Sequence, residues 1–455
     1  MKEVNVKNTI SREDSADRMD FQQLFTRTQK HMSKNYASFM STVEKKKNGN
    51  IEQQMKNYIR QYLIKRKLLA EGYTLEETVD KLTDEMTRFS VLDQYLDPQR
   101  TDVEEVNINA WNDVKVTYSD GRTESVEHFR SPQHCNDIIR RLLRQEKGLT
   151  LDNSRPIVRG HLSGKIRITV VGGECIDNAV GLAASIRIVN PKNFKRQDFI
   201  DNGTTTEAIL MLLKILFING VSMCITGETG SGKTTIMSYL LSQVPYNKRL
   251  FTIEEDVREF NLVIKDEEGN VLNNVVHTVT KKSDDPAQTV DQEKLLETAM
   301  TMDPDFICVA EMKGKEALAA QEAANTGHTV ITTTHARSCR LTYNRMASLC
   351  KNSNDSNEVL VEAAKTAFPI VVFIKKYDDN VRRIEEITEC VIDEEGRSKI
   401  NTLYRYEVRE KSIDENGKVH IEGEFMKKGN ISEYLQKLLK EGTADEQTIK
   451  SIMEG

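Results

Sequence analysis

Residues 227–234 constrain the fold of this chain more than any other segment, because they read Gly-Glu-Thr-Gly-Ser-Gly-Lys-Thr. An apolar stretch, Val221–Thr226, comes directly before them, and a helix-forming stretch, Thr235–Leu241, follows. In the pattern G-x-x-x-x-G-K-[ST], the glycines let backbone N–H groups turn inward around an anion, and the next helix points its positive end at the same place. The segment therefore predicts a phosphate-binding loop; a glycine-rich turn that matches by chance is the alternative.

The residue types in this loop have separate predicted roles. The Lys233 ammonium would carry positive charge to the β- and γ-phosphates, and the Thr234 hydroxyl would take one coordination position of Mg²⁺. We therefore expect ATP and Mg²⁺ as cofactors. The expected cofactor-binding residues are Gly227, Glu228, Thr229, Gly230, Ser231, Gly232, Lys233, Thr234, Thr235 and, from a later segment, His328.

Two acidic segments follow apolar strand-like runs. Glu311 comes just after Phe306–Val309, and the run Glu254–Asp256 comes just after Leu250–Ile253. An acid at the carboxyl end of a strand faces the ligand crevice of a doubly wound sheet, although an acidic run can also be a solvated loop. We predict Glu311, Glu254 and Glu255 as catalytic residues, and Thr234, Glu255 and Glu311 as Mg²⁺ ligands. Which acid of the run 254–256 faces the metal stays open.

Two histidines, His328 and His335, bracket a β-prone run at Val330–Thr334. A lone histidine in such a place is usually structural. Two of them after a phosphate loop and an acid-tipped strand indicate phosphate sensing or the positioning of water. We therefore add His335 to the predicted catalytic residues.

These blocks, in this order, resemble the type II/type IV secretion ATPase superfamily. Its Walker A, Asp, Walker B and His boxes are similar to residues 227–234, 252–260, 305–314 and 326–336. The resemblance to this superfamily continues upstream, at residues 102–109, 155–167 (including Gly164) and 185–187. It therefore covers about Phe89 to Leu439. The helices before this region, and the lack of a CxxC module, resemble the CpaF/Tad branch most, with the type IV secretion traffic ATPases next. Ala310, Lys313 and one extra residue near Glu255 depart from the family pattern.

The alternation of strands with helices after residue 204 indicates a mainly parallel sheet. Together with the resemblance it predicts an α/β protein: a RecA-like P-loop domain at 197–455, a smaller α/β domain at 91–196, and an N-terminal arm with helices at 1–90. The polar segment 192–203 is the expected linker. The resemblance further implies a hexameric ring, nucleotide in the cleft between the domains, and Arg167 and Arg187 reaching it across that cleft.

Composition limits where such a protein works. The net charge is −6, which argues against a protein that coats nucleic acid, and we expect no direct nucleic-acid partner. The seven cysteines form no CxxC pair, which is typical of a reduced compartment. The longest apolar stretch, Ala208–Ile225, is broken by Lys214 and Asn219-Gly220 and predicts a buried helix, a turn and a strand. We expect a cytoplasmic protein that touches the inner face of the cell membrane only peripherally.

The resemblance implies a motor that hydrolyses ATP to drive pilus assembly, protein secretion or conjugative transfer. Its implied partners are further copies of itself and an inner-membrane platform or secretion channel. A DNA-processing RecA-like ATPase would need basic pore loops, and a small-molecule kinase would need a lid and an acceptor pocket. A nucleotide-gated scaffold with little hydrolysis is the remaining alternative, since Lys313 and the altered Asp box depart from the family pattern.

Overall fold

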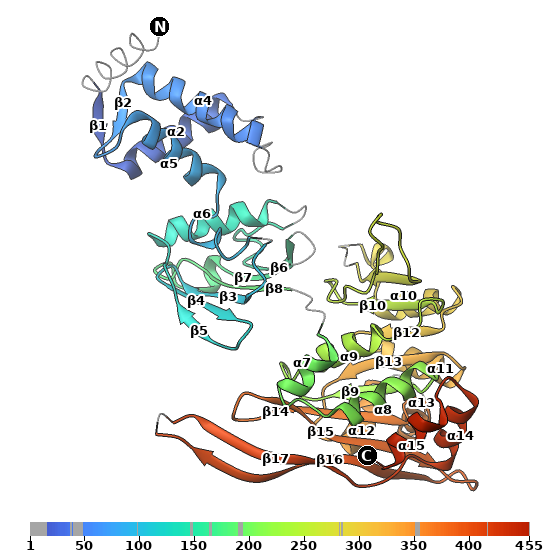
Figure 1. Cartoon of the computed structure of the whole chain (residues 1–455). Helices are drawn as coiled ribbons and strands as arrows, with labels where there is room; N and C mark the ends of the chain where they lie inside the picture. The colour runs from blue at the N-terminus through green and yellow to red at the C-terminus, as the bar shows by residue number, and fades with distance from the viewer. Residues whose placement is uncertain are drawn as a thin grey trace. The chain divides into compact units, whose positions relative to one another are not determined.

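The computed structural model describes residues 16–36, 39, 49–97, 99–145, 149–162, 166–189, 194–281, 283, 285–350, 355–415 and 417–454. Two compact units, 1–190 and 191–455, make up the chain (Figure 1). The first residues of the predicted arm, Gly164 and the first residues of the predicted linker lie outside the described residues. The rest of the predicted linker contains the short helix α7 (Arg196–Asp201). The predicted division into three parts stays a prediction.

The first unit opens with a small helical layer. Its strands β1 (Asp17–Met19) and β2 (Leu68–Ala70) pair in parallel. Helix α5 begins at Thr74, where a capping box with Glu77 satisfies backbone N–H groups. Apolar side chains of these elements share one core, in which Leu24, Ile59 and Leu82 are fully buried. The helices are α2 (Phe21–Asn35), α4 (Gly49–Arg66) and α5 (Leu75–Thr87).

A six-stranded antiparallel sheet forms the rest of this unit, in the order β5-β4-β3-β8-β7-β6. Its strands alternate buried apolar and more exposed residues, so one face packs on helix α6 (Pro132–Leu143) and the other faces away from that core. The smaller α/β domain of the sequence prediction is thus confirmed as a fold. The strands are β3 (Val103–Ala110), β4 (Asp113–Tyr118), β5 (Thr123–Ser125), β6 (Ile157–Leu162), β7 (Ile166–Val171) and β8 (Ala183–Ile188).

The second unit is built on a nine-stranded sheet in the order β11-β10-β12-β13-β9-β14-β15-β16-β17. The first six strands in this order pair in parallel, and the last three continue the sheet in antiparallel pairing. The strands are β9 (Met223–Thr226), β10 (Leu250–Glu254), β11 (Val275–Val279), β12 (Phe306–Val309), β13 (Thr329–Thr334), β14 (Ile370–Lys376), β15 (Arg382–Ile392), β16 (Ser398–Ile413) and β17 (Val419–Lys427).

Helices cover both faces of this sheet, because alternate strand residues enter two separate cores. This is the parallel, RecA-like P-loop architecture that the sequence predicts. The strand-like runs noted in the sequence at 221–226, 250–253, 306–309 and 330–334 correspond to β9, β10, β12 and β13. One core includes α8 (Glu207–Ile218), α9 (Lys233–Leu241), α14 (Glu433–Glu441) and α15 (Glu446–Glu454). The other includes α10 (Gln292–Met300), α11 (Glu316–Asn325), α12 (Cys339–Leu349) and α13 (Asn357–Ala367).

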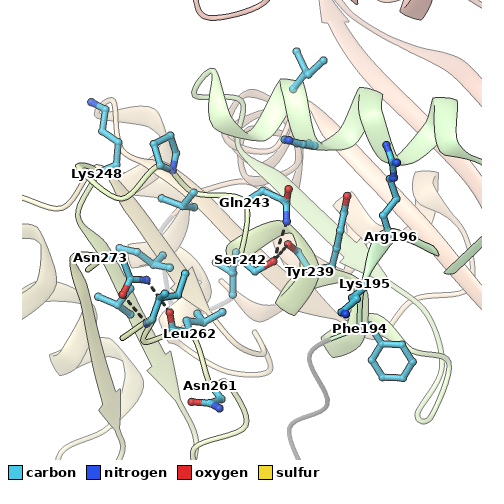
Figure 2. A pocket seen from close by; sticks show the side chains of 18 of the residues that line it. Phe194, Lys195, Arg196, Tyr239, Ser242, Gln243, Lys248, Asn261, Leu262 and Asn273 are labelled. Carbon is cyan, nitrogen blue, oxygen red and sulfur yellow. Dashed lines mark hydrogen bonds between the residues drawn. The ribbon is translucent and has the colours of Figure 1, made fainter. Parts of the chain in front are cut away.

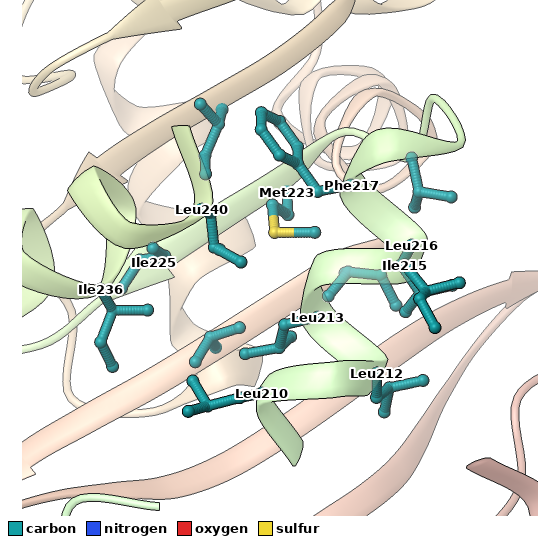
Figure 3. Close-up of a cluster of buried hydrophobic side chains, with 14 of the residues drawn as sticks. Leu210, Leu212, Leu213, Ile215, Leu216, Phe217, Met223, Ile225, Ile236 and Leu240 are labelled. Atoms are coloured by element: carbon teal, nitrogen blue, oxygen red, sulfur yellow. The ribbon is translucent and has the colours of Figure 1, made fainter. Parts of the chain in front are cut away.

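Helix α8 is apolar on nearly every side, and such a helix is stable only inside a protein. Figure 3 shows Leu213, Leu216 and Phe217 of α8 close to Met223 of β9. The Phe217 ring also meets Phe306 edge-on, with ring centroids 5.1 Å apart. The buried helix predicted from 208–225 is therefore confirmed. Within the described part of the chain, no helix combines the length and apolar character that crossing a membrane requires.

We predict that Phe217→Ala lowers the free energy of unfolding of the second unit by about 3–5 kcal/mol, because it leaves a cavity beneath the central strands. Urea-induced unfolding followed by far-ultraviolet circular dichroism is the measurement. Tyr434→Ala is the matched control, since that aromatic ring is 72% exposed. Equal unfolding midpoints for the two variants would contradict the placement of Phe217 in the core.

Candidate functional site

The loop after β9 needs its glycines. Gly227 has φ 152° and Gly232 has φ 99°, both in a region that other residues rarely adopt. A Cβ atom on Gly227 would lie 2.2 Å from the Ile374 carbonyl oxygen of β14, a distance that no side chain tolerates. The loop is thus closely packed against the neighbouring strand. This packing explains why the motif requires glycine at 227 in physical terms.

Lys233 begins helix α9 and turns its side chain back over the loop. Its Nζ donates hydrogen bonds to the carbonyl oxygens of Gly227 at 3.0 Å and Glu228 at 2.9 Å. Burial lowers the pKa of this ammonium, while the negative charge of Glu311 acts in the opposite direction. Lys233 therefore lies as a nearly buried cation inside the loop, within electrostatic reach of Glu311.

Two further groups of the loop bear on anion binding. The Ser231 hydroxyl is buried and has no hydrogen-bond partner among the described residues. Arg382 on β15 donates from Nε to the Gly230 carbonyl oxygen at 2.8 Å. Sequence analysis missed Arg382, because it follows Gly230 by 152 residues and no motif marks it. The loop thus combines glycine turns, a buried ammonium and an orphaned hydroxyl, which fits the phosphates of ATP.

His335 links the end of β12 to the phosphate loop. Its Nε2 lies 2.7 Å from Oε1 of Glu311, and its Nδ1 lies 3.1 Å from the Gly227 carbonyl oxygen. The Lys233 Nζ is 3.3 Å from the same Nδ1. The strand ends are held together by the backbone as well, since Met312 N donates to the Thr333 carbonyl oxygen at 2.8 Å. The structure therefore brings the predicted Glu311 and His335 to the predicted loop.

Glu254 ends β10 in a different environment, fully buried. Its carboxylate accepts the backbone N–H of Glu259 and, at 2.9 Å, that of Phe260. Thr252 donates its hydroxyl to Oε1 at 3.0 Å, and that hydroxyl lies 2.8 Å from Nδ1 of His277 on β11. Glu254 thus anchors the loop that follows it, and this geometry favours a positioning role. Thr252 and His277 were not found from the sequence.

Glu255 is the more accessible of the two glutamates, with its side chain 25% exposed. It forms an ion pair with Lys313, which follows the β12 strand. The next residue, Asp256, has φ 63°, and the chain turns sharply there. This turn lets the backbone N–H of Glu259 reach the Glu254 carboxylate. The predicted metal role of Glu255 stays a prediction; it would require the Lys313 pair to open or rearrange.

His328 lies at the other end of β13 from His335. Its Nδ1 lies 3.1 Å from the Pro304 carbonyl oxygen, in the turn that leads into β12. The six residues of β13 separate the two histidines, and a strand rises by about 3.3 Å per residue. The structure therefore does not bring His328 to the phosphate loop of the same chain. His328 instead connects the start of β13 to the turn that precedes β12.

Arg167 and Arg187 lie in the first unit, on β7 and β8. They are directly paired across the two strands and both are exposed. Their buried neighbours, Ile168 and Ile186, enter the core of that unit on the other face of the sheet. The two like charges in paired positions repel each other, and Glu105 of β3, in register with Arg187, offsets part of that repulsion. Their predicted approach to nucleotide stays a prediction.

The predicted Mg²⁺ ligands fit a metal that arrives with a nucleotide. Mg²⁺ is commonly held by one or two carboxylates together with substrate phosphates, rather than by a cage of protein ligands. In the described ranges no three His, Cys, Asp or Glu side chains form a metal-binding group. Thr234 of the loop and Glu311 next to it would hold the ion, with Glu255 as a third candidate.

We predict that Glu254→Ala lowers the free energy of unfolding of the second unit by about 1–3 kcal/mol for each backbone N–H that loses its acceptor. Glu255→Ala is the matched variant, and its surface ion pair should contribute only about 0–1 kcal/mol. Urea-induced unfolding without nucleotide measures both. A larger loss for Glu255→Ala than for Glu254→Ala would overturn the anchoring role of Glu254.

The sequence of this chain is similar to those of known secretion and conjugal transfer proteins. VirB11, a type IV secretion system protein of Brucella suis, is 35% identical over 149 residues, which are 32% of this chain and 40% of that protein. The conjugal transfer protein TrbB of Rhizobium radiobacter is 26% identical over 52% of this chain and 68% of its own. The match to VirB11 thus spans less than half of that relative.

Among solved structures, the DotB ATPase of Yersinia pseudotuberculosis has a TM-score of 0.48 at 14% identity, covering 77% of this chain and 90% of that one. The family model described as "Type II/IV secretion system protein" matches residues 114–447. These residues include most of the six-stranded sheet of the first unit and the whole phosphate-loop site. This chain therefore belongs to the type II/IV secretion system protein family.

Proposed function

We propose that this chain is a Mg²⁺-dependent ATPase that converts ATP and water to ADP and phosphate at the loop 227–234. The observation that carries the proposal is the position of the Glu311 carboxylate beside the phosphate loop, 2.7 Å from Nε2 of His335, whose Nδ1 lies 3.1 Å from the Gly227 carbonyl oxygen. A carboxylate held beside a phosphate loop is placed to orient and polarise an attacking water molecule.

The residues of this chain have distinct roles in the proposed reaction. Lys233 exchanges the carbonyl oxygens of Gly227 and Glu228 for phosphate oxygens and offsets their negative charge. Glu311 holds the water, and His335 holds Glu311. Thr234 and Glu311 would hold Mg²⁺, which would supply positive charge to offset the negative charge of the phosphates. Glu254 acts indirectly, by fixing the loop that carries Glu255.

Arg167 and Arg187 are the proposed source of positive charge from the first unit. A guanidinium is permanently charged and planar, which suits the charge that develops on a transferring phosphoryl group. Their direct pairing and exposure support the proposal, because a phosphate would offset the part of their repulsion that Glu105, in register with Arg187, leaves. They would supply this charge to the nucleotide bound at the loop 227–234.

The proposed setting is a homohexameric motor in the cytoplasm, bound peripherally to an inner-membrane platform or secretion channel. It would drive pilus assembly, protein secretion or conjugative transfer. Family membership supports this setting, and so do the relatives, whose names refer to type IV secretion and conjugal transfer. Placement in the CpaF/Tad branch is part of the proposal and rests on the sequence resemblance alone.

We predict that Glu311→Gln keeps ATP binding but slows hydrolysis by about two orders of magnitude or more, because the amide polarises water poorly. Steady-state phosphate release and the binding of a fluorescent ATP analogue are the paired measurements. Lys233→Ala should abolish turnover, and Glu322→Gln on the exposed side of α11 should leave it unchanged. Parent-like hydrolysis by Glu311→Gln would exclude Glu311 as the catalytic acid.

We predict that Arg167→Ala or Arg187→Ala strongly lowers turnover while changing nucleotide affinity little, because charge that develops during transfer is stabilised mainly in the transition state. The same two measurements apply. Arg122→Ala is the matched control, since Arg122 is an exposed arginine that precedes the edge strand β5 of the same sheet and has a local Glu124 partner. If both variants turn over at the parent rate, these arginines are ordinary surface charge.

A further inference from the structure

A pocket of about 660 Å³ lies within the second unit, at the end of the sheet opposite the phosphate loop. Leu250 and Val275, the first residues of β10 and β11, line it, as do residues just past the end of α9. In a parallel sheet the amino ends of the strands lie at the edge away from the phosphate loop. The pocket is therefore separate from the proposed ATP site.

The charged groups of this pocket are all cationic. Lys195, Arg196, Lys214 and Lys248 line it, and no acidic side chain does so, although the chain as a whole carries a net charge of −6. Arg196 is paired with Glu207 at 2.6 Å and Lys248 with Asp305 at 2.8 Å. Within the described residues, neither Lys195 nor Lys214 has an ion-pair partner. Two uncompensated ammonium groups therefore favour an anion.

The remaining lining is largely apolar with a few amides. Ile215 and Leu262 are buried and supply apolar contact, and Gln243 and Asn261 supply hydrogen-bonding groups. Figure 2 shows Lys195 and Arg196 on one side of the pocket and Lys248 on the other, with Ser242 and Gln243 between them. A concave site of several hundred cubic ångströms, mostly apolar with a few placed polar groups, is typical of small-ligand binding.

We propose that this pocket binds a small amphiphilic anion, with its acidic group at Lys195 and Lys214 and its apolar body against Ile215 and Leu262. Charge and lining select against the other ligand types. A fully polar anion such as inorganic phosphate would leave the apolar wall uncovered, and an apolar cation would be repelled by Lys195 and Lys214. ATP has its own site at the opposite strand ends.

The test uses 8-anilinonaphthalene-1-sulfonate, an anion on an apolar ring system that fluoresces when it leaves water. The full chain should bind one equivalent with enhanced fluorescence, and dodecyl phosphate should displace it. Dodecyltrimethylammonium, inorganic phosphate and Mg·ATP should not displace it. The double variant Lys195→Glu, Lys214→Glu should weaken binding about tenfold or more, because repulsion replaces two charge-assisted contacts.

Matched variants keep the test decisive. Lys437→Glu reverses the charge of a lysine on α14 that is 76% exposed, and it should bind the probe as the parent does. Lys195→Gln, Lys214→Gln removes charge without adding repulsion and should give an intermediate loss. Unchanged affinity in both double variants, or equal displacement by the cationic detergent, would overturn the proposal. Displacement by Mg·ATP would place the probe at the phosphate loop and overturn it as well.

Discussion

Parallel pairing of β9 with β13, and of β13 with β12, is the constraint on which the candidate site depends. It places the loop after β9, Glu311 after β12 and His335 after β13 at one edge of the sheet. The close packing of Gly227 against β14 then holds the loop in position. Three segments that are far apart in sequence meet because every connecting helix returns the chain to the same edge.

This geometry explains why much of the second unit could be predicted from sequence. Strand runs that are apolar throughout, such as Phe306–Val309, are typical of a sheet covered on both faces, and their carboxyl ends are where ligands bind. This rule alone predicts that Lys233, Glu311 and His335 lie close together. The same rule places His335, at the carboxyl end of β13, near the ligand site, and His328, at the amino end of β13, away from it.

Other features left no readable pattern. All five residues of β11 are half-buried, so this edge strand shows neither a continuous apolar run nor a clean alternation. The burial of Glu254 could not be inferred, because a run of three acids reads as a solvated loop until the backbone N–H groups of Glu259 and Phe260 are seen to point at one of them. Arg382 and His277 act through contacts between distant segments, and single-sequence periodicity contains no information about those.

The directly paired Arg167 and Arg187 have a thermodynamic consequence for the first unit. Their mutual repulsion raises the free energy of the folded sheet by an amount on the order of 0.2–1 kcal/mol. Glu105 of β3 is in register with Arg187 and offsets part of that cost, and an anion bound at the two arginines would offset the rest. By reciprocity, the sheet that holds the two arginines together also sets their affinity for an anion. In this respect the register of β7 and β8 would couple the stability of the sheet to the binding of an anion.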